Sequence, residues 1–300
     1  MGWKICGFSS RNSSILKLKI AITGASGFIG SHLVDKLISN NNNELLIVGR
    51  NVNELKIYFS NNRCVFIELD LNENLTNESL NEISKCDKLI HLAWAGLPNY
   101  TSFSHFNLNL NQHFYFLSEL IKRGLTDITI TGTCFEYGKV EGCLTEDMIP
   151  KPNNFYALAK VTLMNLLLIF KNEFEFKLKW VRIFYIYGDG ESNKSLFSLL
   201  EKAISTNKKQ FDLSPGDQIR DYLTVDEVVN KLIAISLNND FDGVINCSSG
   251  IGLKIKDIVV DYVEQKGAKI QLNFGVLPYN SFESFSFWGD TTLYNKVINH

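Results

Sequence analysis

A tyrosine and a lysine lie four positions apart in the segment Tyr156-Ala157-Leu158-Ala159-Lys160. On a helix this spacing places both side chains on one face, about one turn apart. A nearby ammonium group favours phenolate over phenol and lowers the tyrosine pKa from its reference value of about 10. Tyr156 could then protonate a ketone oxygen near neutral pH as hydride reaches the carbonyl carbon. A helix-surface pair without a catalytic role has the same spacing.

A hydroxyl group that could assist Tyr156 ends an apolar strand-length run, Ile130-Thr131-Gly132-Thr133. A hydroxyl at this position can hydrogen-bond the reacting carbonyl oxygen and hold it toward the tyrosine. The sequence therefore predicts a catalytic set of Thr133, Tyr156 and Lys160.

A glycine-rich turn, Thr23-Gly24-Ala25-Ser26-Gly27-Phe28-Ile29-Gly30, follows an apolar strand and opens an apolar helix. Gly24 permits the tight turn, Gly27 lets the backbone approach a pyrophosphate, and Gly30 allows close packing of helix on strand. The helix N-terminus adds free N–H groups and a positive dipole end. A plain strand-to-helix turn is the alternative, but the position after the first strand favours a dinucleotide site. The loop residues expected to contact the cofactor are Gly24, Ser26, Gly27, Phe28 and Ile29.

The end of the second predicted strand distinguishes the two nicotinamide cofactors. An acidic residue there binds the ribose 2′-OH of NAD. The segment Ile47-Val48-Gly49-Arg50 has no acid, and the guanidinium of Arg50 can pair with a 2′-phosphate. A solvated arginine at a strand end is the other interpretation. The sequence favours NADP.

Apolar runs of strand length alternate with longer segments of helical period. This pattern predicts βαβ units in an α/β fold, a Rossmann-type doubly wound parallel sheet. Strands are expected at 17–23, 44–48, 65–69, 88–93, 128–131, 178–184 and 244–247. Helices are expected at 28–38, 106–122, 156–170, 195–204, 225–237 and 255–264.

The alternation loosens in two stretches, 189–222 and 250–300, which we expect to form a smaller substrate-binding lobe. Residues 17–188, with about 223–249, are expected to form the NADP-binding domain, after an N-terminal extension at 1–16. Ligands of open α/β sheets bind beyond the carboxyl ends of the strands. A second lobe there would close a cleft over the cofactor.

Composition excludes several classes of protein. The 300 residues are 45% hydrophobic and 21% charged with a net charge of −2, which excludes a disordered chain and provides no basic field for nucleic acid. No apolar run reaches the roughly 20 residues that cross a bilayer, so we expect a cytoplasmic protein. The cysteines lack zinc-site spacing, so we expect reduced thiols and no metal: Cys6, Cys64, Cys86, Cys134, Cys143 and Cys247.

These motifs resemble the extended branch of the short-chain dehydrogenase/reductase superfamily. The likeness rests on the Gly-x-x-Gly-x-x-Gly spacing, the Gly-Phe-Ile-Gly ending, and Thr133 four residues before Tyr137-Gly138. It implies that Asn109 orders the active-site network, although Asn107 and Asn111 are alternatives for this alignment. It also implies a homodimer formed through the helices at 106–122 and 156–170, with burial inside the monomer as the other explanation of their apolar side chains. The further cofactor contacts that it implies are Asp70, Leu71, Leu92, Ala93, Trp94, Asn109, Thr131, Tyr156 and Lys160.

Two segments resemble the family's substrate-binding motifs. Arg220-Asp221-Tyr222 is similar to a stretch whose arginine grips the diphosphate of a nucleotide-sugar; an internal Arg–Asp pair is the alternative. Residues 182–188 resemble Arg-x-x-Asn-x-Tyr-Gly, but Tyr185 replaces the asparagine and puts one substrate contact in doubt. The implied substrate contacts are Trp94, Thr133, Cys134, Glu136, Tyr185 and Arg220, with packing as the alternative for Trp94, Cys134 and Glu136.

The loop after Thr133 bears on the reaction. Family members that dehydrate nucleotide-sugars resemble Thr-Asp-Glu-x-Tyr-Gly, and here Cys134 and Phe135 replace both acids, which argues against 4,6-dehydration. Residues 132–138 and 287–290 resemble bacterial reductases of 4-keto-6-deoxy nucleotide-sugars, which make precursors of surface polysaccharides such as O-antigen. The resemblance implies NADPH-dependent reduction of a C4 ketone, with a dTDP-linked sugar as substrate.

Two alternatives to the reductase stay open. An NAD-dependent nucleotide-sugar epimerase would recycle its bound cofactor. A non-catalytic NADP-binding sensor is disfavoured because Tyr156 and Lys160 are both present.

Overall fold

The computed structural model describes residues 17–40, 43–73, 75–191, 194–279 and 284–298. The extension expected at 1–16 lies outside them. Within this part of the chain, no helix combines the length and apolar character needed to span a membrane.

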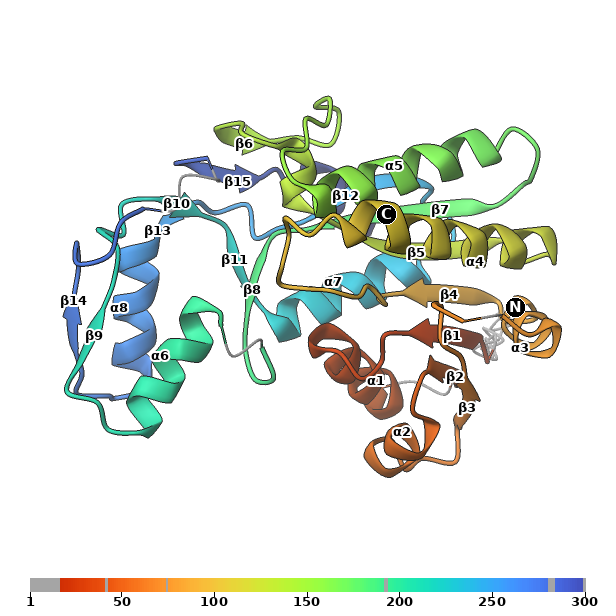
Figure 1. The fold of residues 1–300 in the computed structure, drawn as a ribbon, viewed down its shortest axis with the longest axis horizontal. Helices are drawn as coiled ribbons and strands as arrows, with labels where there is room; N and C mark the ends of the chain where they lie inside the picture. Colours follow the sequence, from red (N-terminus) through yellow and green to blue (C-terminus); the bar gives the residue numbers. More distant parts are fainter. Residues whose placement is uncertain (1–16, 41–42, 74, 192–193, 280–283, 299–300) are drawn as a thin grey trace, which may run out of the picture.

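A seven-stranded parallel sheet forms the centre of the molecule (Figure 1). Its order, β3-β2-β1-β4-β5-β7-β12, reverses direction between β1 and β4, which confirms the predicted doubly wound fold. Most of its strands are largely buried because helices cover both faces, so their sequences are apolar almost throughout. The strands are Lys19–Thr23 (β1), Glu44–Gly49 (β2), Cys64–Glu68 (β3), Lys88–His91 (β4), Asp127–Thr133 (β5), Lys177–Ile183 (β7) and Gly243–Cys247 (β12).

Two helical layers pack on this sheet, and alternate residues of β1 face each of them. Ile20 and Ile22 join a core with α1 and α7, whereas Ala21 joins a second core with α3, α4 and α5. A one-turn π-helix, η1, precedes α4. These helices are Phe28–Asn40 (α1), Asn77–Ser84 (α3), His105–Asn109 (η1), Leu110–Lys122 (α4), Phe155–Phe170 (α5) and Val225–Leu237 (α7).

Two α-helices of the N-terminal half were not predicted, α2 (Val52–Tyr58) and α3. Both are short, and α2 buries only Leu55, so neither has enough apolar positions for a helical period to stand out. Capping side chains start them instead: Asn51 accepts from the Glu54 N–H, and Thr76 accepts from the Ser79 N–H.

Four two-stranded ladders join segments that are far apart in sequence. The ladder of β6 and β15 brings residue 142 beside residue 287, and that of β8 and β11 brings Tyr185 beside Tyr222. The pairs are Gly142–Leu144 (β6) with Phe287–Gly289 (β15), Tyr185–Tyr187 (β8) with Tyr222–Thr224 (β11), Ile219–Arg220 (β10) with Leu253–Lys254 (β13), and Gln210–Asp212 (β9) with Gln271–Asn273 (β14).

A third, smaller core lies at one end of the molecule (Figure 1), where α6 (Leu196–Ser205), α8 (Ile255–Gln265), β9 and β14 meet. Leu200, Leu213, Val259 and Val263 form its buried centre. The last helix, α9 (Thr292–Ile298), contacts α7 and β12 instead. Residues 250–300 therefore do not all pack within the smaller unit, because the chain returns to the large sheet after β15.

Candidate active site

The glycine loop lies at the switch point of the sheet, against the end of β4. Gly24 has φ +76°, and a Cβ there would lie 2.6 Å from the Ala93 nitrogen. A Cβ at Gly30 would lie 2.1 Å from the Gly24 carbonyl oxygen, so helix α1 can pack closely on β1 only without a side chain there. These contacts explain two of the three glycines by space and backbone conformation.

The loop fits the pyrophosphate of a dinucleotide. Ser26 and Gly27 are exposed, and the first turn of α1 contains no acidic residue that would repel an anion. Helix N-termini of this kind bind phosphate through backbone N–H groups. When bound, a nicotinamide cofactor supplies or accepts hydride. Arg50 is exposed directly after β2, and Asp70 and Leu71 lie half-buried after β3.

Tyr156 lies at the start of α5 within a cluster of rings. Its ring centroid is 6.0 Å from that of Trp94, 5.6 Å from Tyr100 and 5.4 Å from His105, and its side chain is buried. Burial raises the pKa of the Tyr156 phenol, with smaller contributions from Tyr100, Glu136 and Cys134. The phenol therefore stays protonated through the neutral range.

Lys160 does not lower the pKa of Tyr156 in this structure, which corrects the prediction from their spacing. Its Nζ donates to the Thr131 carbonyl oxygen at 2.8 Å and lies 4.1 Å from the centroid of the Trp94 ring. The same Nζ is 5.8 Å from the Tyr156 ring centroid. Burial lowers the pKa of Lys160 to about 7, against an opposing effect of Glu136. The physical reason is desolvation, which disfavours the charged form of each group.

Thr133 ends β5 and caps the 3₁₀ turn Cys134–Tyr137 (η2). Its Oγ1 accepts from the Phe135 N–H at 3.3 Å, and its own N–H donates to Glu136 Oε1 at 2.9 Å. Because the hydroxyl oxygen acts as an acceptor within the turn, its hydrogen can be donated to a ligand.

Glu136 packs inside the protein, which was the alternative to its predicted contact with substrate. Its side chain is fully buried and accepts from Trp180 Nε1 at 3.0 Å and from Arg182 Nε at 2.8 Å. The sequence could not show this, because both partners lie on β7, more than forty residues away.

Asn109, not Asn107 or Asn111, faces the site. Asn109 is buried and its Nδ2 donates to the Ala95 carbonyl oxygen at 2.9 Å, whereas its two neighbours are exposed. It closes the π-helix η1, whose extra residue per turn changes the direction in which side chains point; such turns are frequent at functional sites.

Several histidines of the site were not predicted. His105 accepts the Trp94 indole N–H at 3.1 Å, and below them His91 Nε2 and His113 Nδ1 lie 2.7 Å apart. His91 Nδ1 is 2.8 Å from Thr23 Oγ1 at the base of the glycine loop. Burial, assisted by Lys160, lowers the pKa of His91 to about 3. Their spacing in sequence gives no motif, because each comes from a different element.

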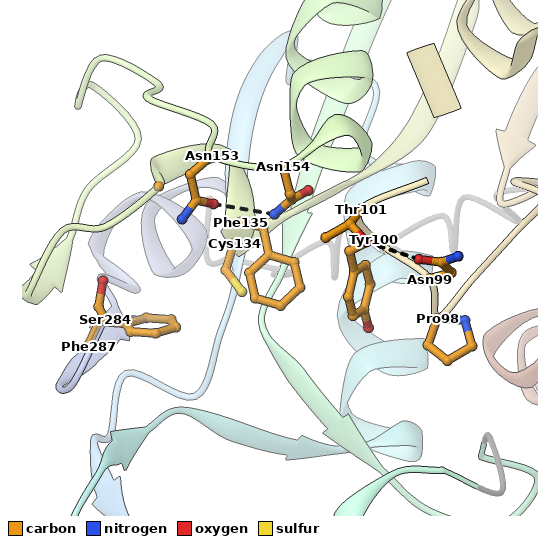
Figure 2. Close-up of a pocket in the computed structure, with 11 residues that line it drawn as sticks. Pro98, Asn99, Tyr100, Thr101, Cys134, Phe135, Asn153, Asn154, Ser284 and Phe287 are labelled. Carbon is orange, nitrogen blue, oxygen red and sulfur yellow. Dashed lines mark hydrogen bonds between the residues drawn. The ribbon is translucent and has the colours of Figure 1, made fainter. Parts of the chain in front are cut away.

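A pocket of about 210 Å³ opens beside this cluster (Figure 2). The rings of Tyr100 and Phe135 meet edge to face with centroids 5.0 Å apart, and Cys134 lies beside Phe135 in the figure. The pocket is lined by Pro98, Asn99, Tyr100, Thr101, Cys134, Phe135, Gly138, Asn153, Asn154, Ser284 and Phe287.

Arg220 packs against Phe287, which is one of the residues that line this pocket. Its guanidinium carbon is 4.7 Å from the Phe287 ring centroid and 5.6 Å from that of Tyr185, and Nη1 donates to two backbone carbonyl oxygens. Asp221 accepts from the N–H groups of Ser249, Gly250 and Gly289, so its carboxylate holds loops together.

A doubly wound sheet with a glycine loop at its switch point defines a Rossmann-type, dinucleotide-binding class of enzyme. Residues 20–248 match the model of the NAD dependent epimerase/dehydratase family. The chain belongs to this family, within the short-chain dehydrogenase/reductase superfamily, and the resemblance drawn from the motifs is confirmed.

Two relatives from Aggregatibacter actinomycetemcomitans are similar over most of the chain. The dTDP-6-deoxy-L-talose 4-dehydrogenase (NAD(+)) is 27% identical, covering 91% of this chain and 99% of the relative. The GDP-6-deoxy-D-talose 4-dehydrogenase is 26% identical, covering 80% and 78%. The structure of MoeE5 in complex with UDP-glucuronic acid and NAD has the same fold, with a TM-score of 0.77, 23% identity, and coverage of 94% and 92%. The matched relatives modify nucleotide-linked sugars.

Proposed function

We propose that this protein transfers hydride between a nicotinamide cofactor and C4 of a nucleotide-linked 6-deoxyhexose. The proposed direction is reduction of the 4-keto sugar, dTDP-linked, with NADPH. Two relatives named as 6-deoxytalose 4-dehydrogenases support the position and the sugar class. Oxidation of a C4 alcohol and reduction of the C4 ketone are one reaction run in opposite directions, so both names are consistent with the same site.

The observation that carries this proposal is the chemistry of the pocket wall. Of the described residues that line it, none is a carboxylic acid, and Cys134 and Phe135 follow Thr133 directly. Expulsion of water from C6 needs an acid and a base beside the sugar. Reduction of a ketone by hydride needs only one proton donor and no carboxylic acid, and Tyr156 lies beside Tyr100 of this wall.

The residues have distinct roles in the proposed reduction. Thr133 donates its hydroxyl hydrogen to the C4 carbonyl oxygen and orients it. Tyr156 gives its phenolic proton to that oxygen as hydride adds to carbon, so that the ketone becomes a secondary alcohol. A raised pKa keeps Tyr156 protonated, which suits the reductive direction. Lys160, on the same helix, supplies an ammonium group beside Trp94.

The proposed cofactor is NADPH. Arg50 provides an exposed guanidinium after β2, and the described residues leave it without an ion-pair partner. The first-named relative is described with NAD(+), so cofactor preference is a separate point of test.

The direct test is the loss of absorbance from NADPH, and separately from NADH, when the protein meets dTDP-4-keto-6-deoxyglucose. Product is identified by NMR. Substrate-dependent oxidation of the cofactor, with a C4 alcohol of either configuration as product, supports the reductase. Absence of oxidation with either cofactor contradicts it.

The second candidate is an NAD-dependent nucleotide-sugar epimerase, which the family description favours. An epimerase would copurify with bound cofactor and change a sugar stereocentre without net loss of NADPH. The same NMR assay, run on dTDP-hexoses without added cofactor, separates the two functions.

We further propose a homodimer and a cytoplasmic role in making sugar precursors of surface polysaccharides. Exposed apolar side chains on the two helices expected at the dimer contact support the first proposal: Tyr115 on α4, and Phe155, Leu158, Leu168 and Ile169 on α5. The likeness of residues 132–138 to bacterial reductases supports the proposed role in making sugar precursors.

A further inference from the structure

Glu136 connects the turn that contains Thr133 to the neighbouring strand β7. Its Oε1 accepts from the Thr133 N–H at 2.9 Å and from Trp180 Nε1 at 3.0 Å. Its Oε2 accepts from Arg182 Nε at 2.8 Å. Glu136 is fully buried, Trp180 is also fully buried and Arg182 nearly so, so water cannot replace any of these bonds. Three donors from two strands therefore fix one carboxylate.

The backbone beside Thr133 leaves room for this arrangement. A Cβ at Gly132 would lie 2.3 Å from Trp180 Nε1 and 2.4 Å from Glu136 Oε1. The carboxylate and the indole thus occupy the space that any side chain at position 132 would need. Trp180 and Arg182 point to the same face of β7 because they are two residues apart on a strand. Gly132 on β5, and Trp180 and Arg182 on β7, therefore together hold the Glu136 carboxylate in one place.

We propose that Glu136 is a positioning residue, which fixes the Thr133 hydroxyl toward the reacting oxygen, and that its carboxylate also acts electrostatically on Tyr156 and Lys160. This inference rests on the proposed function, in which Thr133 and Tyr156 act on the C4 oxygen. A glutamine at position 136 cannot replace it, because its NH₂ group would face a donor, either the Thr133 N–H or the Arg182 guanidinium.

Because Glu136 acts on Tyr156 and Lys160 through its charge, the proposal predicts a change in the pH dependence of kcat. Glu136 raises the pKa of both Lys160 and Tyr156, so its removal lowers both. The other titratable groups near Lys160 are His91 from β4 and His113 from α4, whose pKa values burial holds well below neutral. Near Tyr156 the remaining groups, Tyr100 and Cys134, are unchanged by the substitution. The plot of kcat against pH falls at alkaline pH when one of these two groups loses its proton. Whichever group this is, we expect the alkaline limb of the plot to move toward lower pH in the variant.

The test compares the wild type with Glu136→Gln in the NADPH-dependent reduction of dTDP-4-keto-6-deoxyglucose. We expect kcat to fall by about 10- to 100-fold with KM changed by less than about threefold, because a small displacement of a catalytic group carries that cost. The alkaline limb of kcat should move to lower pH. Unchanged kcat, or a lower kcat with an unmoved limb, overturns the proposal.

Tyr137→Phe is the matched control. It lies in the same turn and loses the buried hydrogen bond from its hydroxyl to Asn246 Oδ1 at 2.7 Å, together with the interaction of that hydroxyl with Arg182. The Glu136 carboxylate and its bond from the Thr133 N–H stay in place. We expect its kcat within about twofold of wild type and its alkaline limb unmoved. An equal effect in Tyr137→Phe would show that Glu136 acts only through general stability, and would overturn the proposal.

A second variant covers the case in which Glu136→Gln does not fold, as judged by circular dichroism. Trp180→Phe removes one donor and keeps the carboxylate on Thr133 and Arg182. We expect kcat to fall by about three- to tenfold with the limb unmoved, and unchanged kcat overturns the proposal. Wild type and Tyr156→Phe are assayed alongside. An inactive wild type refutes the proposed function, whereas an active wild type with an unaffected Glu136→Gln refutes this inference alone.

Discussion

Tyr156 and Lys160 lie on one helix face, as their spacing predicts, but burial changes what each can do. The phenol keeps its proton at neutral pH, and Lys160 can lose its proton near a pH of about 7. The sequence shows which residue types are four apart; it does not show how far each is removed from water. Ring neighbours such as Trp94 and His105, which exclude water here, come from other segments.

Replacement of Tyr156 by phenylalanine should lower turnover of the keto sugar by about 10²- to 10⁴-fold, because the proton donor is lost. NADPH binding should persist, since the glycine loop is unchanged. Turnover is followed by loss of NADPH absorbance, and binding by quenching of tryptophan fluorescence. Full turnover in the variant would contradict the mechanism.

Replacement of Arg50 by serine should raise the KM for NADPH by about tenfold or more, because a charge-assisted hydrogen bond to the 2′-phosphate is lost. The KM for NADH should stay within about twofold. Lys56→Ser, an exposed cation on the adjacent helix α2, is the matched control. Equal effects on both cofactors would show that Arg50 does not recognise the 2′-phosphate.

At the scale of elements, sequence patterns predicted those that are long and uniformly apolar. The seven strands of the large sheet and helices α1, α4, α5 and α7 were predicted within a few residues of their observed ends. The short ladders were not, because each strand has two or three residues and its partner can be over a hundred positions away, as in β6 with β15. Such pairings depend on tertiary packing rather than on local period.

The contact between β4 and α4 contains the buried pair His91 and His113, and it should make stability depend on pH. The pKa of His91 is lowered to about 3 in the folded protein, against about 6.5 unfolded. The unfolded chain therefore binds more protons between these values, so the stability of the folded state is full above about pH 6.5 and falls as the solution is acidified.

His91→Gln should reduce this dependence. We expect the slope of unfolding free energy against pH to decrease by up to about 1.4 kcal/mol per pH unit between about pH 6 and 4. Urea denaturation at several pH values measures the slope. An identical slope in wild type and variant would show that His91 is not the group that titrates.

At the scale of the whole molecule, the apolar side chains left exposed on α4 and α5 are the feature that an assembly would cover. Leu168 on α5 is 43% exposed, and Leu199 on α6, in the smaller unit, is 44% exposed. Leu168→Glu should convert a dimer to a monomer, whereas the matched Leu199→Glu should not. Size-exclusion chromatography with light scattering gives the mass of each, and a monomeric wild type would contradict the proposed dimer.

The ribosome synthesises the chain from its N-terminus, and the residues of the pocket wall come from both early and late parts of the chain. Cys134 and Phe135 belong to the large sheet unit, whereas Phe287 reaches the pocket only through the ladder of β15 with β6. On the ribosome, the residues of the dinucleotide loop and all seven sheet strands therefore emerge well before Phe287. The glycine loop is therefore synthesised before the last part of the pocket wall.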